Sequence, residues 1–430
     1  MKHIYKHLTL YSLLFCFLFN IIGGLIFINA IVEKTKYFNI DYHMSETEKN
    51  TYVITGLSGD VVIPRKFTNI QFKVYSGMWS VTSLTVEKGN KKYYSKGNCI
   101  IEKGTDKLML TCENSIIPLE VKIINSDSLM SMNIKYEGTP IDWLKIKAEL
   151  DENSISIKNE YANVLFNVNG QYSQLEKLVV PDGITEIHSY MFRNFNALKE
   201  VKLSSSVTKI GDYAFYGCKL LTKVVLNEGL IDVGEFAFGD CTKLVDINIP
   251  NSLTYFSNQM FWNCTSLKDI NIHSNIKQIG GQAFYKCALE EVYISENVEI
   301  INGSAFDSCH QLKKLSLPFI GKSRTNEGVE SVNIWYIFVG SAYFSDRLPD
   351  SLEELVIYGD AVIKENYLKG TIKVKKIYLL DNVKVISDEA FTDYDGYWDV
   401  TVYCEANNKP DDWSENWDQY IKNVEWGYKG

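Results

Sequence analysis

Five cysteines recur at nearly constant spacing in the middle of the chain: Cys218, Cys241, Cys264, Cys287 and Cys309. Their intervals of 22–23 residues are far from the two-residue spacing of a zinc knuckle, which argues against a metal site. On neighbouring coils of a stacked structure they would lie about 5 Å apart, within reach of a disulfide. Five is an odd number, however, and the preceding repeat has no cysteine at this position. We therefore predict buried, reduced, structural thiols.

The other reactive residues form no recognised catalytic or metal-binding pattern. The six histidines are scattered, and the chain holds no H-E-x-x-H, nucleophile elbow, P-loop or dinucleotide-binding glycine motif. The acidic run at residues 388–399 lacks the spacing of an EF-hand. Cys99 and Cys112 flank a predicted hairpin, and a disulfide between them is left open. We predict that the chain is not an enzyme and has no catalytic residue, no metal site and no cofactor.

A leucine phrase, L-x-x-L-x-L, marks the elements that must position the cysteines. Its copies start at Leu175, Leu198, Leu221, Leu244, Leu267, Leu289 and Leu312. The last two apolar positions of the phrase lie two residues apart, and then the pattern stops. This spacing predicts a short strand with one buried face in every repeat.

A second phrase closes each repeat and carries a phenylalanine that precedes the cysteine. The phenylalanines are Phe192, Phe215, Phe238, Phe261, Phe284 and Phe306. One coil cannot bury its own leucines, whereas stacked coils form a parallel strand ladder around continuous columns of side chains. A period of 20–29 residues with this leucine phrase is typical of leucine-rich repeats. We predict a right-handed leucine-rich-repeat solenoid with coils of 22–23 residues, in which the phenylalanines and the five cysteines form a structural ladder.

One repeat, VTKIGDYAFYGCKLLTKVVL at residues 207–226, resembles the BspA-like subclass of leucine-rich repeats. Residues 84–118 resemble a variant repeat of that family in which a strand pair replaces the second phrase, and residues 134–146 resemble another of its recurring segments. The resemblance covers roughly residues 50–430. It implies a repeat protein of bacterial cell surfaces, of a kind that is also expanded in some parasitic protists.

The N-terminal segment has the composition of a membrane helix. Residues 8–32 contain no charged side chain. A spanning helix needs about 20 apolar residues, whereas the apolar core of a cleaved signal runs about 7–15. We predict that residues 1–32 form a signal-anchor or transmembrane helix that holds the repeats outside the cytoplasm, in a single-pass cell-membrane protein. The alternative is secretion after signal cleavage near Ala30.

The rest of the chain divides into six predicted segments: a polar stalk at 33–49, divergent β-rich repeats at 50–170, the regular array at 171–318, an insertion at 319–347, final coils at 348–404, and a cap at 405–430. The insertion is inferred because Leu312 and Leu352 begin consecutive phrases 40 residues apart. Insertions into repeats are often loops on the binding face.

Two surfaces are candidates for binding. The first consists of outward strand residues that alternate with the core leucines: Glu200, Lys202, Lys223, Asp246, Asn248, Asp269, Asn271, Glu291, Tyr293 and Lys314. The second consists of Trp335 and Tyr336 in the insertion, because aromatic side chains are enriched at interfaces. Packing of the insertion against the solenoid is the alternative for these two residues.

The overall charge excludes one class of partner. The net charge is −9, from 44 basic and 53 acidic residues, and no basic patch with interleaved aromatics occurs, so we predict no nucleic-acid partner. The chain is predicted to be a non-catalytic surface protein that recognises a protein or a glycan for adhesion. The alternatives are a structural scaffold without a specific ligand and a hydrolase with its site in residues 50–170.

Overall fold

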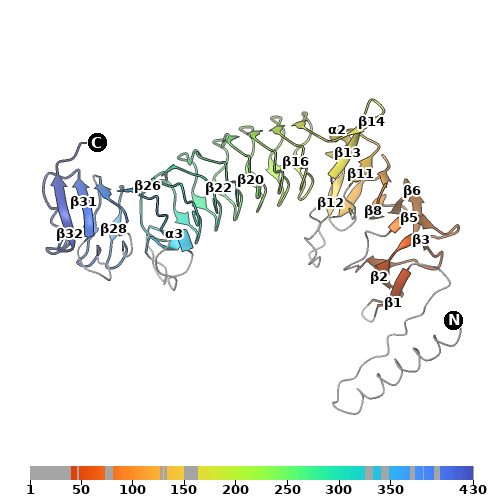
Figure 1. Cartoon of the computed structure of the whole chain (residues 1–430), viewed down its shortest axis with the longest axis horizontal. Coiled ribbons are helices and arrows are strands. Elements are labelled where there is room, and N and C mark those ends of the chain that lie inside the picture. The colour runs from red at the N-terminus through yellow and green to blue at the C-terminus, as the bar shows by residue number, and fades with distance from the viewer. Residues whose placement is uncertain are drawn as a thin grey trace, which may run out of the picture.

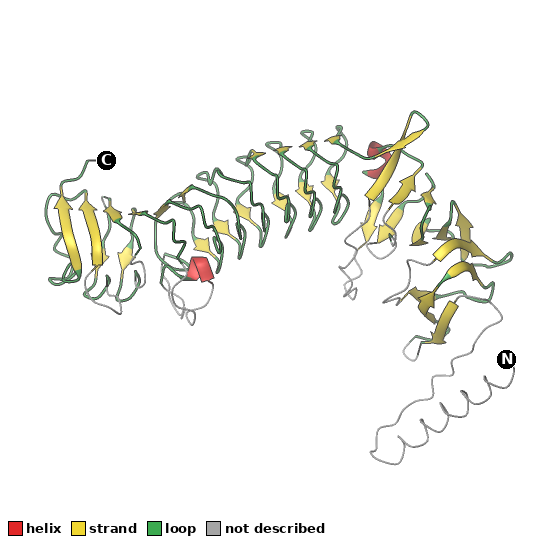
Figure 2. Cartoon of the chain, in the orientation of Figure 1, coloured by secondary structure: helices red, strands yellow, loops and turns green. Residues whose placement is uncertain are grey.

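The computed structural model shows an elongated, curved stack of coils built from short strands and turns (Figures 1 and 2). Two short helices lie within the described residues, α2 (Pro140–Trp143) and α3 (Tyr336–Val339). The structure describes residues 40–45, 48–72, 81–125, 129, 133–149, 163–324, 333–339, 348–368, 373–380, 382–391 and 398–429.

The N-terminal third is rich in strands. Its first strands are β1 (Ile40–Met44), β2 (Tyr52–Leu57), β3 (Gly59–Ile63), β4 (Ile70–Phe72), β5 (Val81–Val86), β6 (Tyr93–Lys96), β7 (Cys99–Glu102) and β8 (Lys107–Thr111). They are followed by β9 (Ile116–Ile117), β10 (Ile123–Asn125), β11 (Asn133–Tyr136), β12 (Lys147–Glu149), β13 (Asn163–Val168) and β14 (Gln171–Ser173). Strands β6, β7 and β8 pair antiparallel, whereas β8, β10 and β12 pair parallel, so hairpins and coils alternate in this part.

The middle of the chain forms regular coils, each with two short strands. One parallel sheet contains β15 (Lys177–Val179), β17 (Glu200–Lys202), β19 (Lys223–Val225) and β21 (Asp246–Ile247). A second contains β16 (Glu186–Ile187), β18 (Lys209–Ile210) and β20 (Asp232–Val233). Residues 23 positions apart are register partners, as in the pairs Lys177 with Glu200 and Glu200 with Lys223. The predicted parallel solenoid of leucine-rich-repeat type is therefore confirmed.

Stacked aromatic rings run through the core of these coils. The six ladder phenylalanines are fully buried, and consecutive rings have centroids 5.3–5.8 Å apart and planes within 12° of parallel. The first leucine of each repeat phrase is buried beside them. The repeated phrase thus places identical side chains in register, so that each coil completes the core of its neighbour.

Both sheets are interrupted within the array, the second ladder after β20 and the first after β21. The second ladder resumes with β22 (Tyr255–Phe256), β23 (Gln278–Ile279) and β25 (Ile300–Ile301). The first resumes with β24 (Glu291–Tyr293) and continues through β26 (Lys314–Leu317), β27 (Glu354–Ile357), β29 (Lys376–Leu379), β31 (Trp398–Cys404) and β32 (Ile421–Trp426). Strands β28 (Val362–Ile363) and β30 (Val385–Ile386) form a further parallel pair beside this sheet.

Tryptophans close the C-terminal end of the stack. Trp413 and Trp417 are buried, and both contact the ring of Trp426. The indole of Trp413 donates a hydrogen bond to the carbonyl oxygen of Val383 at 3.1 Å. The last coil is therefore covered by a tryptophan cluster and by strand β32.

The described part of the insertion continues the core. The amide of Phe306 donates to the carbonyl oxygen of Ile337 at 2.9 Å, just as the amide of Phe284 donates to Ala305 one coil earlier. Ile337 and Phe338 are buried, so they take the places of the repeated alanine and phenylalanine. Trp335 is only 4% exposed and packs in the same core. The proposed surface role of Trp335 is therefore wrong, because its ring fills the coil interior, while Tyr336 is half-buried.

The predicted membrane helix at residues 1–32 and the first part of the stalk lie outside the described residues. Among the residues that are described, no helix is long and apolar enough to span a membrane.

Candidate functional site

The outward surface of the first sheet carries charges that pair along the stack. Lys177 and Glu200 are joined by an ion pair of 2.8 Å, and Lys223 and Asp246 by one of 2.6 Å. The hydrogen bond that the Lys223 ammonium donates to the Asp246 carboxylate raises the pKa of Lys223. Lys202, at the other end of strand β17, is exposed. The sign of the charge alternates from coil to coil, so the candidate residues Glu200, Lys223 and Asp246 already form ion pairs within the sheet.

Asn248 was predicted to lie on the binding surface, but its side chain forms hydrogen bonds with the backbone of the preceding coil. Its amide oxygen accepts a hydrogen bond from the Leu226 N–H at 2.8 Å, and its amide nitrogen donates to the Leu226 carbonyl at 2.9 Å. The side chain therefore links two coils at the point where the strand ladder ends. Asp269 and Asn271 follow in the next coil, where no strand forms, and both are exposed.

The outward surface of the second half of the sheet carries a second alternating row. Glu291, Lys314, Glu354 and Lys376 are successive register partners. The Glu354 carboxylate forms an ion pair with the Lys376 ammonium group, with 3.0 Å between Oε1 and Nζ. Its other oxygen lies 3.8 Å from the Nζ of Lys314. The candidate residues Glu291 and Lys314 thus form the start of a longer charged row than the sequence analysis proposed.

Tyrosines line the strands beside this charged row. The register partners of Tyr293 on the following strands are Ser316, Val356, Tyr378 and Tyr403. Tyr293 is 59% exposed, whereas Tyr378 and Tyr403 are half-buried. We call Tyr293, Tyr378, Tyr403 and Tyr428 the tyrosine face.

The tyrosine face is held in place by ring contacts. The rings of Tyr378 and Tyr403 stack with centroids 5.0 Å apart, and Tyr428 lies 5.2 Å from Tyr378 and 5.4 Å from Tyr403. At the other end, Tyr293 stacks on Tyr358 at 5.4 Å. Burial, followed by the nearby Glu354 carboxylate, raises the pKa of Tyr378, so its hydroxyl stays protonated at neutral pH. The ring contacts therefore fix the orientation of these side chains before any partner binds.

The repeated cysteines are placed for packing rather than for reaction. Each thiol donates to the carbonyl oxygen of the phenylalanine in the preceding coil, at 3.1–3.3 Å. All five are buried and free, and burial raises the pKa of Cys218 and of Cys309 to about 12. Cys99 and Cys112 are likewise buried, free thiols. No group of three potential metal ligands occurs among the described residues.

Comparison with known proteins places this repeat in a family. Residues 167–290 and 277–397 match the BspA type leucine rich repeat region, in six copies. No curated protein matches the chain.

Three solved structures match the chain at low identity. A leucine rich cell surface protein from Faecalibacterium prausnitzii A2-165 is 18% identical, with 60% of this chain and 89% of that chain covered and a TM-score of 0.30. A leucine-rich repeat protein from Bacteroides ovatus ATCC 8483 is 13% identical, with coverage of 90% and 91% and a TM-score of 0.37. The pneumococcal vaccine antigen PcpA is 15% identical, with coverage of 93% and 98% and a TM-score of 0.34. The family match spans more than half of the chain and agrees with the stacked coils described above, so this chain belongs to the BspA-type leucine-rich-repeat family.

Proposed function

We propose that the chain is a non-catalytic recognition protein of the cell surface, and that its tyrosine face binds a partner protein. The observation that carries this proposal is the shared register of Tyr293, Tyr378 and Tyr403 on one side of a continuous parallel sheet. Residues of the same row point to the same face of a sheet, so one partner can contact them together.

Tyrosine suits such a surface for two physical reasons. It offers a large contact area but loses few side-chain rotations on binding, and its hydroxyl both donates and accepts hydrogen bonds. The stacked rings of Tyr378 and Tyr403 are already fixed before a partner arrives. The adjacent charged row, centred on Glu354, supplies a polar rim of the kind that surrounds protein interfaces.

The two alternative functions, a structural scaffold and a hydrolase, would require different structural features. A pure scaffold needs no exposed aromatic row, whereas a hydrolase needs a nucleophile or carboxylate pair in a cleft. Among the described residues of 50–170, the cysteine thiols are those of Cys99 and Cys112, and burial raises the pKa of both. This environment disfavours the reactive thiolate and supports the non-catalytic proposal.

The test is site-specific photocrosslinking of the full chain. Benzoylphenylalanine is introduced at Tyr293 or Tyr403, and the purified protein is titrated onto a panel of bacterial and animal cells before irradiation. We expect a crosslinked protein whose yield saturates with concentration and disappears when the cells are pretreated with protease. The same band must be absent when the crosslinker replaces Ile231, which is equally exposed at 58% but lies elsewhere on the solenoid.

A second variant separates binding from labelling. Tyr378→Ala combined with Tyr403→Ala removes two half-buried rings and should abolish saturable attachment to the cells. Saturable attachment that survives this double substitution would place the binding site elsewhere. Failure of the unmodified chain to bind any cell saturably would favour the scaffold instead.

Attachment to the membrane is a separate proposal. We infer that the apolar residues 8–32 anchor the protein, with secretion after cleavage as the alternative. Intact mass and membrane partition of the natively expressed chain decide between them. Retention of residues 1–32, with release only by detergent, supports the anchor, whereas a soluble product that starts near residue 31 refutes it.

A further inference from the structure

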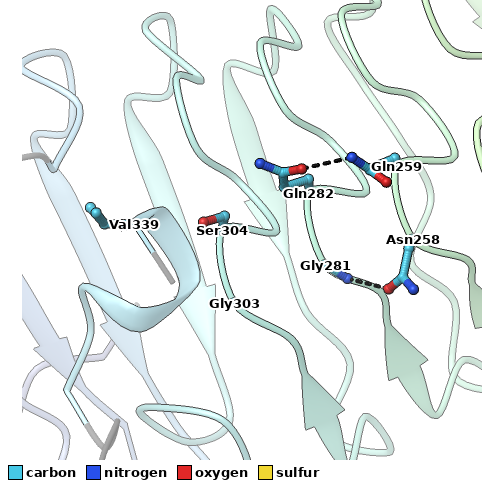
Figure 3. Close-up of a pocket in the computed structure, with 7 residues that line it drawn as sticks. All are labelled: Asn258, Gln259, Gly281, Gln282, Gly303, Ser304 and Val339. Carbon is cyan, nitrogen blue, oxygen red and sulfur yellow. Dashed lines mark hydrogen bonds between the residues drawn. The ribbon is translucent and has the colours of Figure 1, made fainter. Parts of the chain in front are cut away.

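A shallow groove runs along the turns of three consecutive coils (Figure 3). It has a volume of about 410 Å³, and its lining residues are Asn258, Gln259, Gly281, Gln282, Gly303, Ser304 and Val339. Val339 belongs to helix α3, which is held to the neighbouring coil by the hydrogen bond from the Ser304 amide to the Tyr336 carbonyl at 2.9 Å. The insertion therefore supplies one end of the groove.

The sequence explains why a groove forms at this place. The residue three positions before the ladder phenylalanine is Asp212, Glu235 and Asn258 in successive coils, and then becomes Gly281 and Gly303. Loss of these side chains opens space between the turns. Gly281 has room for more, since an added Cβ would meet its nearest neighbour, the Gly303 carbonyl oxygen, at 3.4 Å.

The groove is lined by polar groups without charge. The amide nitrogen of Gln259 donates to the amide oxygen of Gln282 at 2.8 Å, and the other end of the Gln282 amide points toward Ser304 and Val339 (Figure 3). Asn258 accepts a hydrogen bond from the Gly281 N–H at 2.8 Å. Amides and a hydroxyl both donate and accept hydrogen bonds, as the hydroxyl groups of a sugar require. An ionic ligand would find no counter-charge among the seven lining residues.

Two aromatic rings border the same turns. Trp262 and Tyr285 follow Gln259 and Gln282 by three residues, and their rings stack 5.7 Å apart with planes 9° from parallel. Both side chains are half-buried, so part of each ring remains accessible. Apolar ring surface beside amide groups matches the alternating C–H and O–H groups of a pyranose.

The spacing of the coils fits an extended peptide poorly. The rings of Trp262 and Tyr285, on neighbouring coils, are 5.7 Å apart. An extended peptide returns a side chain to the same face only about every 6.6 Å, so its side chains would fall out of step with the coils. A sugar chain carries hydroxyl groups on every unit, so it can find hydrogen-bonding partners on more than one coil without a fixed side-chain repeat.

We propose that this groove binds a neutral polysaccharide, with its chain parallel to the axis of the solenoid. The site is independent of the tyrosine face, which lies on the strands and is proposed to bind a protein. Gln259, Gln282 and Ser304 make the hydrogen bonds, and Trp262 and Tyr285, which belong to the same turns but lie outside the seven lining residues, extend the binding surface with apolar rings.

The experiment uses the full chain. Binding is first measured on an array of neutral and acidic oligosaccharides, and the best neutral hexasaccharide among cellohexaose, xylohexaose, mannohexaose and maltohexaose is then titrated by calorimetry. We expect saturable binding that Trp262→Ala weakens by about tenfold. Gln282→Ala should weaken it in the same direction. Gly281→Asn, which restores the side chain carried by the preceding coil at Asn258, should block binding by filling the groove.

The controls keep the result interpretable if one variant folds poorly. Each variant must retain the thermal midpoint of the unmodified chain, and Ile231→Ser, elsewhere on the same array, should leave affinity unchanged. Tyr378→Ala should also leave it unchanged, which separates this site from the tyrosine face. Absence of binding to every neutral oligosaccharide, preference for acidic ones, or affinity unaffected by both Gly281→Asn and Gln282→Ala would overturn the proposal.

Discussion

The thiol of Cys241 donates a hydrogen bond to the backbone carbonyl oxygen of Phe215, 3.2 Å away in the preceding coil. The same contact recurs at every cysteine of the ladder, and it adds a second donor to a buried carbonyl that already accepts a backbone N–H of its own coil. A cysteine therefore recurs at the same position of successive coils, because its side chain is small and apolar and can still donate a hydrogen bond.

The buried thiols should make stability depend on pH at the alkaline end. In the folded protein the pKa of Cys218 is raised from 9.0 to about 12, so the native state keeps a proton that the unfolded chain releases above pH 9. This stability is fully present below pH 9 and is lost as the pH rises toward 12. Urea midpoints from pH 7 upward should be flat and then fall, with a shallower fall for Cys264→Ala. A midpoint that rises above pH 9 would contradict this account.

Truncation of one ring should weaken the whole aromatic column. Phe238 is fully buried and lies between the rings of Phe215 and Phe261. We expect Phe238→Ala to lower the free energy of unfolding by about 3–5 kcal/mol. Urea denaturation followed by circular dichroism measures the loss, with Phe238→Leu as the milder control. Unchanged stability of Phe238→Leu would show that ring stacking contributes nothing beyond apolar volume, and unchanged stability of Phe238→Ala would contradict the buried column.

The insertion tryptophan should behave as a core residue. Trp335 packs among the buried residues of the coil that α3 completes. Trp335→Ala should cost about 3–5 kcal/mol of stability, whereas Tyr336→Ala, at a half-buried position, should cost clearly less. The same urea titration compares the two. An unchanged urea midpoint for Trp335→Ala would contradict the buried position of this residue.

Two glycines in equivalent turns should tolerate alanine differently. An added Cβ on Gly234 would lie 2.4 Å from the backbone nitrogen of Asp212, whereas on Gly281 the nearest atom is 3.4 Å away. Gly234→Ala should therefore destabilise the protein by about 1–3 kcal/mol, and Gly281→Ala should be nearly neutral. Thermal melts of both variants provide the comparison. Similar melting temperatures would mean that the coils can separate without cost.

The sequence was sufficient for the regular coils because each repeat places the same side chains at the same spacing. Leu221, Phe215 and Cys218 are buried where the period predicted them. It was insufficient for the insertion, because Phe306 and Phe338 are 32 residues apart, and this interval does not fit the period of 22–23 residues. The burial of Trp335 depends on this missed coil.

Surface roles were harder to predict because they depend on neighbours in other coils. Asn248 was a candidate for the outward binding surface, yet its side chain forms hydrogen bonds with the backbone of Leu226 at the end of a sheet. Tyr378 and Tyr403 occupy the same strand position as Tyr293, and following that position through the final coils would have found them. The groove at Gly281 depends on side chains that are absent, which a search for reactive residue types does not detect.

The alternating charges on the first sheet also specify the order in which the coils assemble. Lys177, Glu200, Lys223 and Asp246 follow one another as register partners. If the coil of Lys177 skipped its neighbour and stacked on the coil of Lys223, two ammonium groups would face each other, and Glu200 would meet Asp246. Like charges directly opposite are unfavourable in a sheet. The alternating charges thus favour stacking of coils that are adjacent in the sequence. They disfavour stacking of coils that are two repeats apart, although the coils are otherwise nearly identical.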